Sequence, residues 1–317
     1  GVAPAAHRLP VAVIGATGKV GRHAVRQLAE QGCQVRCLVR HKPSTRPNAA
    51  QDATPAEVAA WLATMPGVEL VQGDVTDRQA VIDLVQGCSA CLALHGAVRR
   101  TQPGDLLPWV DETAEPGHAK QVNFEGVQSI IDAARASGTC KRIVRITGKG
   151  ETPWSPVGIL INGLGSMAKA WNYEGERLLR GCDDVDYTIV RPGYMGDVDA
   201  ELEEDAALTL ADNGGDLKVT AIPHRSVAQL CVRSLDYPNA ARTTLCAMTV
   251  PKAEGEESFD PLLAKVSSDT RVFPGDENLE GHYLAVRVGG LVLLGFVGGF
   301  AAGVGSVLQA AVQMLAR

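Results

Sequence analysis

A cluster of three glycines between an apolar strand and a helix is the feature that most constrains the fold of this chain. The β-branched run Val11 to Ile14 ends at the segment Gly15-Ala-Thr-Gly18-Lys-Val-Gly21. A helical spacing of apolar residues then extends from Lys19 to Gln31, and Gly32 is suited to cap its end. This arrangement is typical of the first strand–helix unit of a dinucleotide-binding sheet.

Each glycine of this loop has a separate use in such a unit. Gly15 permits a tight turn, Gly18 lets the backbone approach a pyrophosphate, and Gly21 lets the helix pack on the strand. The first N–H groups of the helix then bind the phosphate oxygens. We therefore expect a cofactor site here, the alternative being a purely structural turn. The loop residues expected to bind the cofactor are Gly15, Thr17, Gly18, Lys19, Val20 and Gly21.

Strand-like and helix-like segments alternate along the first two thirds of the chain. Further strands are expected at 33–39, 68–71, 88–94, 142–147 and 186–190, and further helices at 54–64, 77–86, 122–136 and 167–180. Beyond Pro192 the signal is weaker, with helices expected at 226–235 and 261–266 and a strand at 242–249. The alternation predicts an α/β fold with a doubly wound, mostly parallel Rossmann sheet.

The composition excludes several other classes of protein. The 317 residues include 36 acidic and 30 basic side chains, and only 4% are aromatic. A nucleic-acid partner is therefore not expected, because neither a basic stripe nor a base-stacking surface is present. The eight cysteines, including Cys88 and Cys91, lie mostly in apolar runs and are predicted to be buried thiols. No grouping of His, Cys, Asp and Glu has the spacing of a metal site.

The C-terminal part of the chain differs sharply from the rest. From Val288 to Ala316 there is no charged residue, and seven glycines fall in this stretch. Val288 to Leu308 is long and apolar enough to be a single transmembrane helix, the alternative being a buried glycine-rich helix. Three glycines spaced by four would form a smooth face for helices of a membrane protein complex. They are Gly295, Gly299 and Gly303.

These patterns predict three parts. Residues 1–270 would form an NAD(P)-binding domain with a small C-terminal substrate lobe, 271–287 a linker and 288–317 a membrane anchor. The chain begins with Gly1 rather than Met, so we expect that a targeting segment has been removed.

The end of the second strand indicates which dinucleotide is bound. An NAD site usually has an acidic residue there for the ribose 2′-OH, but this strand ends Leu38-Val39-Arg40. The Arg40 guanidinium is suited to a 2′-phosphate. NADP(H) is therefore favoured over NAD(H), the alternative being a solvated basic strand end.

Further segments carry a family resemblance. Gly73-Asp74-Val75, Asn123, Tyr187-Thr-Ile-Val-Arg191-Pro192-Gly193 and His224-Arg-Ser-Val-Ala228 follow the glycine loop in order. With them, the chain from Pro10 to Val266 resembles the NmrA-like branch of the atypical short-chain dehydrogenases/reductases, which is abundant in plastids and cyanobacteria.

The resemblance implies positions for several residues around the cofactor. Asp74 and Val75 would lie near the adenine, and Thr147 near the nicotinamide. Leu94, His95 and Gly96 would lie near the ribose and nicotinamide side. Pro192 and Gly193 would close over the carboxamide.

The catalytic pattern of the superfamily is incomplete in this chain. Active members use a tyrosine and a lysine four residues later, and the lysine lowers the pKa of the tyrosine. Here Lys169 stands at the tyrosine position and Tyr173 at the lysine position. Arg177 follows Tyr173 by four residues, but arginine holds its proton too firmly to relay it. The catalytic candidates are Thr147, Tyr173 and Lys169, the alternative being that they line a cleft without catalysis.

Two functions remain open. One is a membrane-anchored, NADP(H)-binding accessory, assembly or redox-sensing subunit of a larger membrane complex. The resemblance points to a photosynthetic complex of the chloroplast thylakoid, with the mitochondrial inner membrane as the alternative. The other is an NADPH-dependent reductase of a lipophilic substrate such as a pigment, quinone or isoprenoid.

Overall fold

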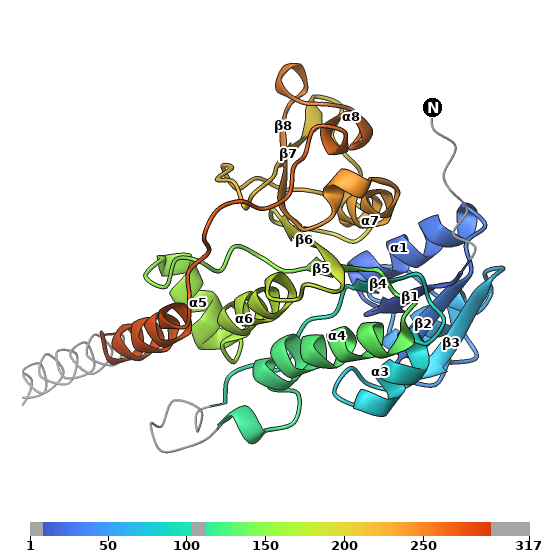
Figure 1. The fold of residues 1–317 in the computed structure, drawn as a ribbon, viewed down its shortest axis with the longest axis horizontal. Helices are drawn as coiled ribbons and strands as arrows, with labels where there is room; N and C mark the ends of the chain where they lie inside the picture. The colour runs from blue at the N-terminus through green and yellow to red at the C-terminus, as the bar shows by residue number, and fades with distance from the viewer. Residues whose placement is uncertain (1–8, 103–111, 293–317) are drawn as a thin grey trace, which may run out of the picture.

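An eight-stranded, mostly parallel sheet forms the centre of the protein (Figure 1). The computed structural model describes residues 9–102 and 112–292. The strand order is β3-β2-β1-β4-β5-β6-β8-β7, and only the β7–β8 pair is antiparallel. The strands are β1 (Val11–Ile14), β2 (Val35–Val39), β3 (Val68–Gln72), β4 (Ala90–Ala93), β5 (Arg142–Ile146), β6 (Asp186–Pro192), β7 (Ala206–Ala211) and β8 (Thr243–Pro251). The predicted doubly wound Rossmann sheet is confirmed, and the strand order reverses between β1 and β4.

Helices cover both faces of the sheet. They are α1 (Lys19–Glu30), α2 (Pro55–Leu62), α3 (Arg78–Val85), α4 (Gly126–Ser137), α5 (Pro156–Leu164), α6 (Ala168–Arg180), α7 (His224–Arg233) and α8 (Asp260–Leu263). Successive side chains of β1 point to opposite faces. Val13 therefore packs in a core with α1, α2 and α7, whereas Ile14 packs in a second core with α3 and α4.

The polar segment between β2 and β3 contains the predicted short helix, α2. Its first turn is closed by a capping box, in which Thr54 Oγ1 accepts from the Glu57 N–H at 3.3 Å and Glu57 Oε2 accepts from the Thr54 N–H at 2.9 Å. Arg22 of α1 also holds this segment. Its Nη1 donates to the carbonyl oxygens of Ala49 and Ala50 at 2.7 and 2.8 Å. The segment is thereby held next to the glycine loop.

Neither β7 nor α5 was predicted from the sequence. β7 is a six-residue edge strand that contains three alanines, and its antiparallel pairing with β8 defines it more than its own composition does. α5 begins after Ser155, whose hydroxyl accepts from the Gly158 N–H at 3.4 Å. Its apolar residues are mostly exposed, so the usual signal of an inward apolar stripe is absent.

The C-terminal part of the described chain contains a further helix. Residues 277–292 are helical, so this helix covers the second half of the expected linker 271–287. This helix is held to the domain by Asn278 and His282, which both bond to the Gly150 carbonyl oxygen at 2.9 Å.

The predicted membrane span, Val288 to Leu308, falls largely on residues that the structure does not describe. Residues 293–308 are outside the described residues, and so are Gly295, Gly299 and Gly303. Within 9–102 and 112–292, no helix combines the length and apolar character needed to cross a membrane.

All eight cysteines are buried and unpaired, as predicted. Burial raises the pKa of Cys140 to about 12 and raises the pKa of Cys91 well above its usual value. Because thiolates are the reactive form, we predict that the native protein reacts negligibly with Ellman's reagent, whereas the denatured protein releases eight equivalents. Rapid reaction of Cys88 or Cys91 in the native state would contradict their assignment to the core.

Candidate functional site

A cavity of about 670 Å³ opens at the carboxyl ends of β1, β2, β3 and β4. This is where the strand order of the sheet reverses, the usual ligand position in doubly wound folds. Nine of the predicted cofactor-binding residues line it. They are Gly15, Thr17, Gly18, Arg40, Asp74, Val75, Leu94, His95 and Gly96.

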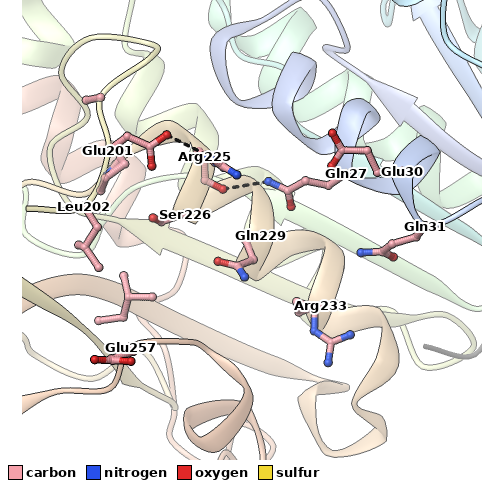
Figure 2. A pocket seen from close by; sticks show the side chains of 13 residues that line it. Gln27, Glu30, Gln31, Glu201, Leu202, Arg225, Ser226, Gln229, Arg233 and Glu257 are labelled. Carbon is pink, nitrogen blue, oxygen red and sulfur yellow. Dashed lines mark hydrogen bonds and ion pairs between the residues drawn. The ribbon is translucent and has the colours of Figure 1, made fainter. Parts of the chain in front are cut away.

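A second depression, of about 440 Å³, lies between α1 and α7 (Figure 2). Its charged and amide groups bond to one another. Arg225 Nη1 donates to Glu201 Oε1 at 2.8 Å, and Gln27 Nε2 donates to the Arg225 carbonyl at 3.2 Å. None of the predicted cofactor residues is among the described residues that line it, so the cavity at the strand ends is the candidate site.

The glycine loop depends on close backbone contacts. Gly15 has a φ of +83°, and a Cβ there would lie 2.7 Å from the Leu94 carbonyl group. A Cβ at Gly21 would lie 2.0 Å from the Gly15 oxygen. The loop therefore passes directly over the end of β4, and α1 starts immediately behind it.

The start of α1 has the properties of an anion-binding helix end. Gly18 is the N-cap residue, without a side-chain cap, and the first turn of α1 has no acidic residue. Lys19, Val20 and Gly21 are not among the residues that line the cavity. Val20 and Gly21 are buried in α1, and the cofactor contacts predicted for all three residues stay predictions.

Arg40 and Asp74 lie together where β2 and β3 end. Arg40 Nε is 3.8 Å from Asp74 Oδ2, and the Arg40 side chain is 58% exposed. Asp74 is fixed separately, because its Oδ1 accepts from the N–H and the hydroxyl of Thr76 at 2.9 and 2.8 Å. The guanidinium therefore projects into the cavity with a single long ionic contact, an arrangement that leaves donors available for a phosphate.

Arg145 of β5 lies beside the end of β4 and is bonded to His95, which lines the cavity. This buried guanidinium donates to the carbonyl oxygens of Ala93 and His95 at 3.0 and 2.5 Å, and to Asn172 Oδ1 at 2.8 Å. Burial lowers the pKa of Arg145 to about 10. Arg145 was not predicted from the sequence. The only sequence signal for it was a basic side chain within an apolar strand.

His95 lines the cavity as predicted, and its ring is held by a backbone carbonyl group. Its Nε2 lies 3.1 Å from the Val122 carbonyl. Burial, followed by the charge of Arg145, keeps the pKa of His95 well below its usual value. The imidazole is therefore neutral at physiological pH.

The three catalytic candidates do not meet at the cavity. None of Thr147, Tyr173 and Lys169 is among the described residues that line it. Tyr173 is fully buried, and its hydroxyl donates to the Pro274 carbonyl at 2.9 Å. Burial raises the pKa of this phenol strongly, so it keeps its proton. Lys169 is half-buried, and burial together with the charges of Arg191 and Lys149 lowers its pKa.

Glu176 of α6 accounts for the position of Thr147. The Thr147 hydroxyl donates to Glu176 Oε1, which also accepts from Arg191 Nε at 3.0 Å. Arg180 Nη2 donates to Glu176 Oε2 at 2.7 Å. Burial opposes ionisation of this fully buried carboxyl, but the two arginines outweigh it and hold the pKa of Glu176 below its usual value. We call Glu176, Arg180, Arg191 and Thr147 the Glu176 cluster.

Pro192 and Gly193 were also expected at the cavity, and neither is among its lining residues. A Cβ at Gly193 would lie 2.1 Å from the Thr220 carbonyl oxygen, so this segment packs tightly against residues 220–221. The Gly193 N–H also donates to the Ala247 carbonyl of β8 at 2.9 Å, and the predicted closure over the carboxamide stays a prediction.

The fold and this cavity define a Rossmann protein with a dinucleotide site. The chain belongs to the NAD(P)H-binding family, whose family model matches residues 15–238. This membership bears out the predicted nicotinamide dinucleotide cofactor and the resemblance to atypical short-chain dehydrogenases/reductases.

Named relatives have different functions. The chain is 24% identical to Photosystem II assembly factor Ycf39 of Trieres chinensis over 73% of this chain and 61% of that protein. It is 29% identical to the Cyanophora paradoxa protein of the same name over 40% and 31%. The chain thus spans less than two thirds of both. It is also 23% identical to sanguinarine reductase of Eschscholzia californica, over 84% of this chain and 99% of that enzyme.

Solved structures agree on the fold. A putative NAD-dependent epimerase/dehydratase from Bacillus halodurans has a TM-score of 0.58 at 17% identity, covering 81% of this chain and all of the other. A short-chain dehydrogenase/reductase from Veillonella parvula, solved in complex with NADP, has a TM-score of 0.55 at 11% identity, covering 78% and 97%. At these identities the likeness establishes the fold alone.

We predict that Arg40→Ala weakens NADPH binding by about tenfold to a hundredfold, because a charge-assisted bond to the 2′-phosphate is lost. NADH binding should change little. Isothermal titration of both nucleotides checks this, with Arg46→Ala as the control at an exposed arginine outside the cavity. Equal loss for both nucleotides would show that Arg40 does not read the 2′-phosphate.

We predict that Glu176→Gln lowers the free energy of unfolding by about 3–5 kcal/mol at pH 7, because Arg180 and Arg191 lose their buried counter-charge. The lowered pKa of Glu176 means that its stabilisation is complete above about pH 4.5 and disappears as the pH falls through the folded-state pKa. The difference between variant and wild type should therefore shrink in acid. Urea unfolding between pH 7 and 3.5 measures it.

The control for this experiment is Glu201→Gln, which alters an exposed ion pair with Arg225. It should change the free energy of unfolding by about 0.5 kcal/mol or less. A similarly small effect of Glu176→Gln would contradict the structural role of the cluster.

Proposed function

We propose that this protein is an NADP(H)-binding accessory, assembly or redox-sensing subunit of a photosynthetic membrane complex, without reductase activity of its own. The observation that carries the proposal is the contrast between an intact dinucleotide cavity and catalytic candidates that are engaged in structural bonds. Bound nucleotide stabilises a folded domain by mass action, so an inactive site can still depend on its ligand.

NADP(H) is the nucleotide that suits the cavity best. Arg40 offers a positive charge where an NAD site usually offers a carboxylate, and Asp74 is already bonded within its own turn. The NADP complex of the Veillonella parvula neighbour agrees with this choice. Gly15, Thr17 and Gly18 would hold the pyrophosphate at the start of α1.

The proton-transfer groups explain why we expect no reductase activity. A hydride transfer to a carbonyl needs a nearby group that gives a proton at neutral pH. The Tyr173 phenol has a strongly raised pKa and donates to Pro274, while the Thr147 hydroxyl donates to Glu176. Both hydroxyl protons are therefore already committed to acceptors within the protein.

The photosynthetic setting is supported by the two Ycf39 relatives, each named as a Photosystem II assembly factor. We propose a chloroplast thylakoid location on this basis rather than the mitochondrial inner membrane. Residues 1–270 would be the nucleotide-binding unit, and the uncharged stretch within 288–317 would attach it to the membrane.

One observation favours the second candidate, an NADPH-dependent reductase of a lipophilic substrate. Lys169 is half-buried and has a lowered pKa, two properties that suit a proton donor. The match to sanguinarine reductase covers 84% of this chain and 99% of that enzyme. Lys169 is therefore the residue on which a reductase would depend.

We predict that the full-length protein binds NADPH but does not oxidise it faster than buffer when quinones, pigments or isoprenoids are supplied. Tyr173→Phe should leave NADPH affinity unchanged and lower the free energy of unfolding by about 1 kcal/mol, because the bond to Pro274 is lost. Tyr194→Phe, at an exposed tyrosine, is the matched control. Absorbance at 340 nm and urea unfolding provide the two measurements.

Turnover with any of these acceptors that disappears in Lys169→Met or Tyr173→Phe would replace the accessory role with the reductase. Failure to bind NADPH at all would contradict both candidates.

A further inference from the structure

Helix α5 presents its apolar side to the outside of the protein. Val157, Leu160, Ile161 and Leu164 follow the spacing i, i+3, i+4 and i+7, which places them on one side of the helix. All four are exposed, by 47 to 64%. The buried residues of α5 are Gly158 and Asn162, so the usual orientation of an amphipathic helix is inverted.

The helix formed by residues 277–292 packs beside α5 and exposes apolar residues of its own. Asn162 Nδ2 of α5 lies 3.0 Å from His282 Nδ1, and a Cβ at Gly289 would lie 2.9 Å from Ile159. The two helices are therefore packed together, and Figure 1 shows them side by side at the end of the molecule opposite β3. We call their exposed apolar residues, together with Trp154 just before α5, the α5 face. Its members are Trp154, Val157, Leu160, Ile161, Leu164, Leu284, Val288, Leu291 and Val292.

The size of this face needs an explanation. Scattered apolar residues are normal on a protein surface, but nine exposed large apolar residues on and beside two packed helices point to a binding surface. Residues 156–164 contain no charged side chain, and the only charge between 281 and 292 is that of Arg287. The face therefore lacks the acidic and basic groups that would indicate a polar partner.

The direction of the chain indicates what covers the face. The helix at 277–292 leads into residues 293–316, none of which is charged. The apolar character therefore continues along the sequence for more residues than is usual in a segment exposed to water. We propose that the α5 face lies in the lipid interface of a membrane, with α5 parallel to the surface.

The residues at its rim suit this position. Trp154 stands at the start of α5 with 55% of its surface exposed, and tryptophan favours the headgroup level. Arg287 is exposed and can reach lipid phosphates beside an interfacial helix.

The same contact brings the nucleotide cavity close to the membrane. The Thr101 N–H donates to the Leu164 carbonyl at 2.9 Å, which connects the end of α5 to the segment after β4. Val98 of that segment is 78% exposed and lines the cavity. Docking through the α5 face therefore orients the cavity beside the lipid headgroups. This inference rests on the membrane association proposed above and not on NADP(H) binding.

The experiment uses the buried state of all natural cysteines. Leu160→Cys can be labelled selectively with the fluorophore NBD, and Val272→Cys, 95% exposed and outside the α5 face, is the matched control. The full chain is reconstituted into vesicles of phosphatidylcholine and phosphatidylglycerol. We expect a blue shift of the label at 160 and loss of its emission with brominated acyl chains. The label at 272 should show neither change.

Several outcomes would overturn the inference. Emission at 160 that stays that of a water-exposed label, in protein that floats with the vesicles, would show attachment without docking of α5. A blue shift without vesicles that grows with protein concentration would assign the face to a second copy. As a second test, Leu164→Glu in the Leu160→Cys protein should abolish the lipid quenching while leaving thermal unfolding unchanged, and quenching that survives it contradicts the inference.

NADPH binding measured on the same labelled protein separates this inference from the proposed function. Intact NADPH binding without lipid quenching rejects docking alone, whereas lipid quenching without NADPH binding rejects the nucleotide-dependent role alone. Protein that does not float with vesicles at all rejects both docking and membrane association.

Discussion

The rest of this domain depends on the ion pairs and hydrogen bonds that the buried Glu176 carboxylate makes. It joins α6 to β6 through Arg191 and to the end of β5 through Thr147. Arg191 Nη1 then donates to Glu151 at 2.6 Å, so the network reaches the segment that leads into α5. A buried charge without such partners would be strongly destabilising, and the geometry of this side of the sheet is therefore tightly constrained.

The cavity and the Glu176 cluster lie in different parts of the sheet. The dinucleotide cavity is formed by the other half of the sheet, where the glycine loop, Arg40 and the end of β4 meet. Thr147 and Tyr173, two of the groups predicted to move a proton, lie on the side that contains the Glu176 cluster. The protein thus keeps the means to bind a nucleotide while the hydroxyls of Thr147 and Tyr173 serve the fold.

Local signals in the sequence were enough to predict the sheet, the glycine loop and Arg40, because each depends on short-range pattern or steric rules. The capping box at Thr54 identified α2 in the same way. Whether a side chain points into the protein or toward solvent, and which distant residue it meets, could not be predicted as well as these local features. Arg145 and Glu176 are polar residues whose partners lie far away along the chain, and β7 is defined by its pairing. α5 was missed because its apolar stripe points outward, which only its packing against the helix at 277–292 reveals.

Native mass spectrometry of the full-length protein with NADPH tests the central claim most directly, because it reports binding and chemistry together. The account predicts one bound NADPH, still in its reduced form after prolonged incubation with a quinone or pigment acceptor. Conversion of the bound nucleotide to NADP⁺ with formation of reduced acceptor would contradict it, and so would a protein that never acquires the mass of a nucleotide.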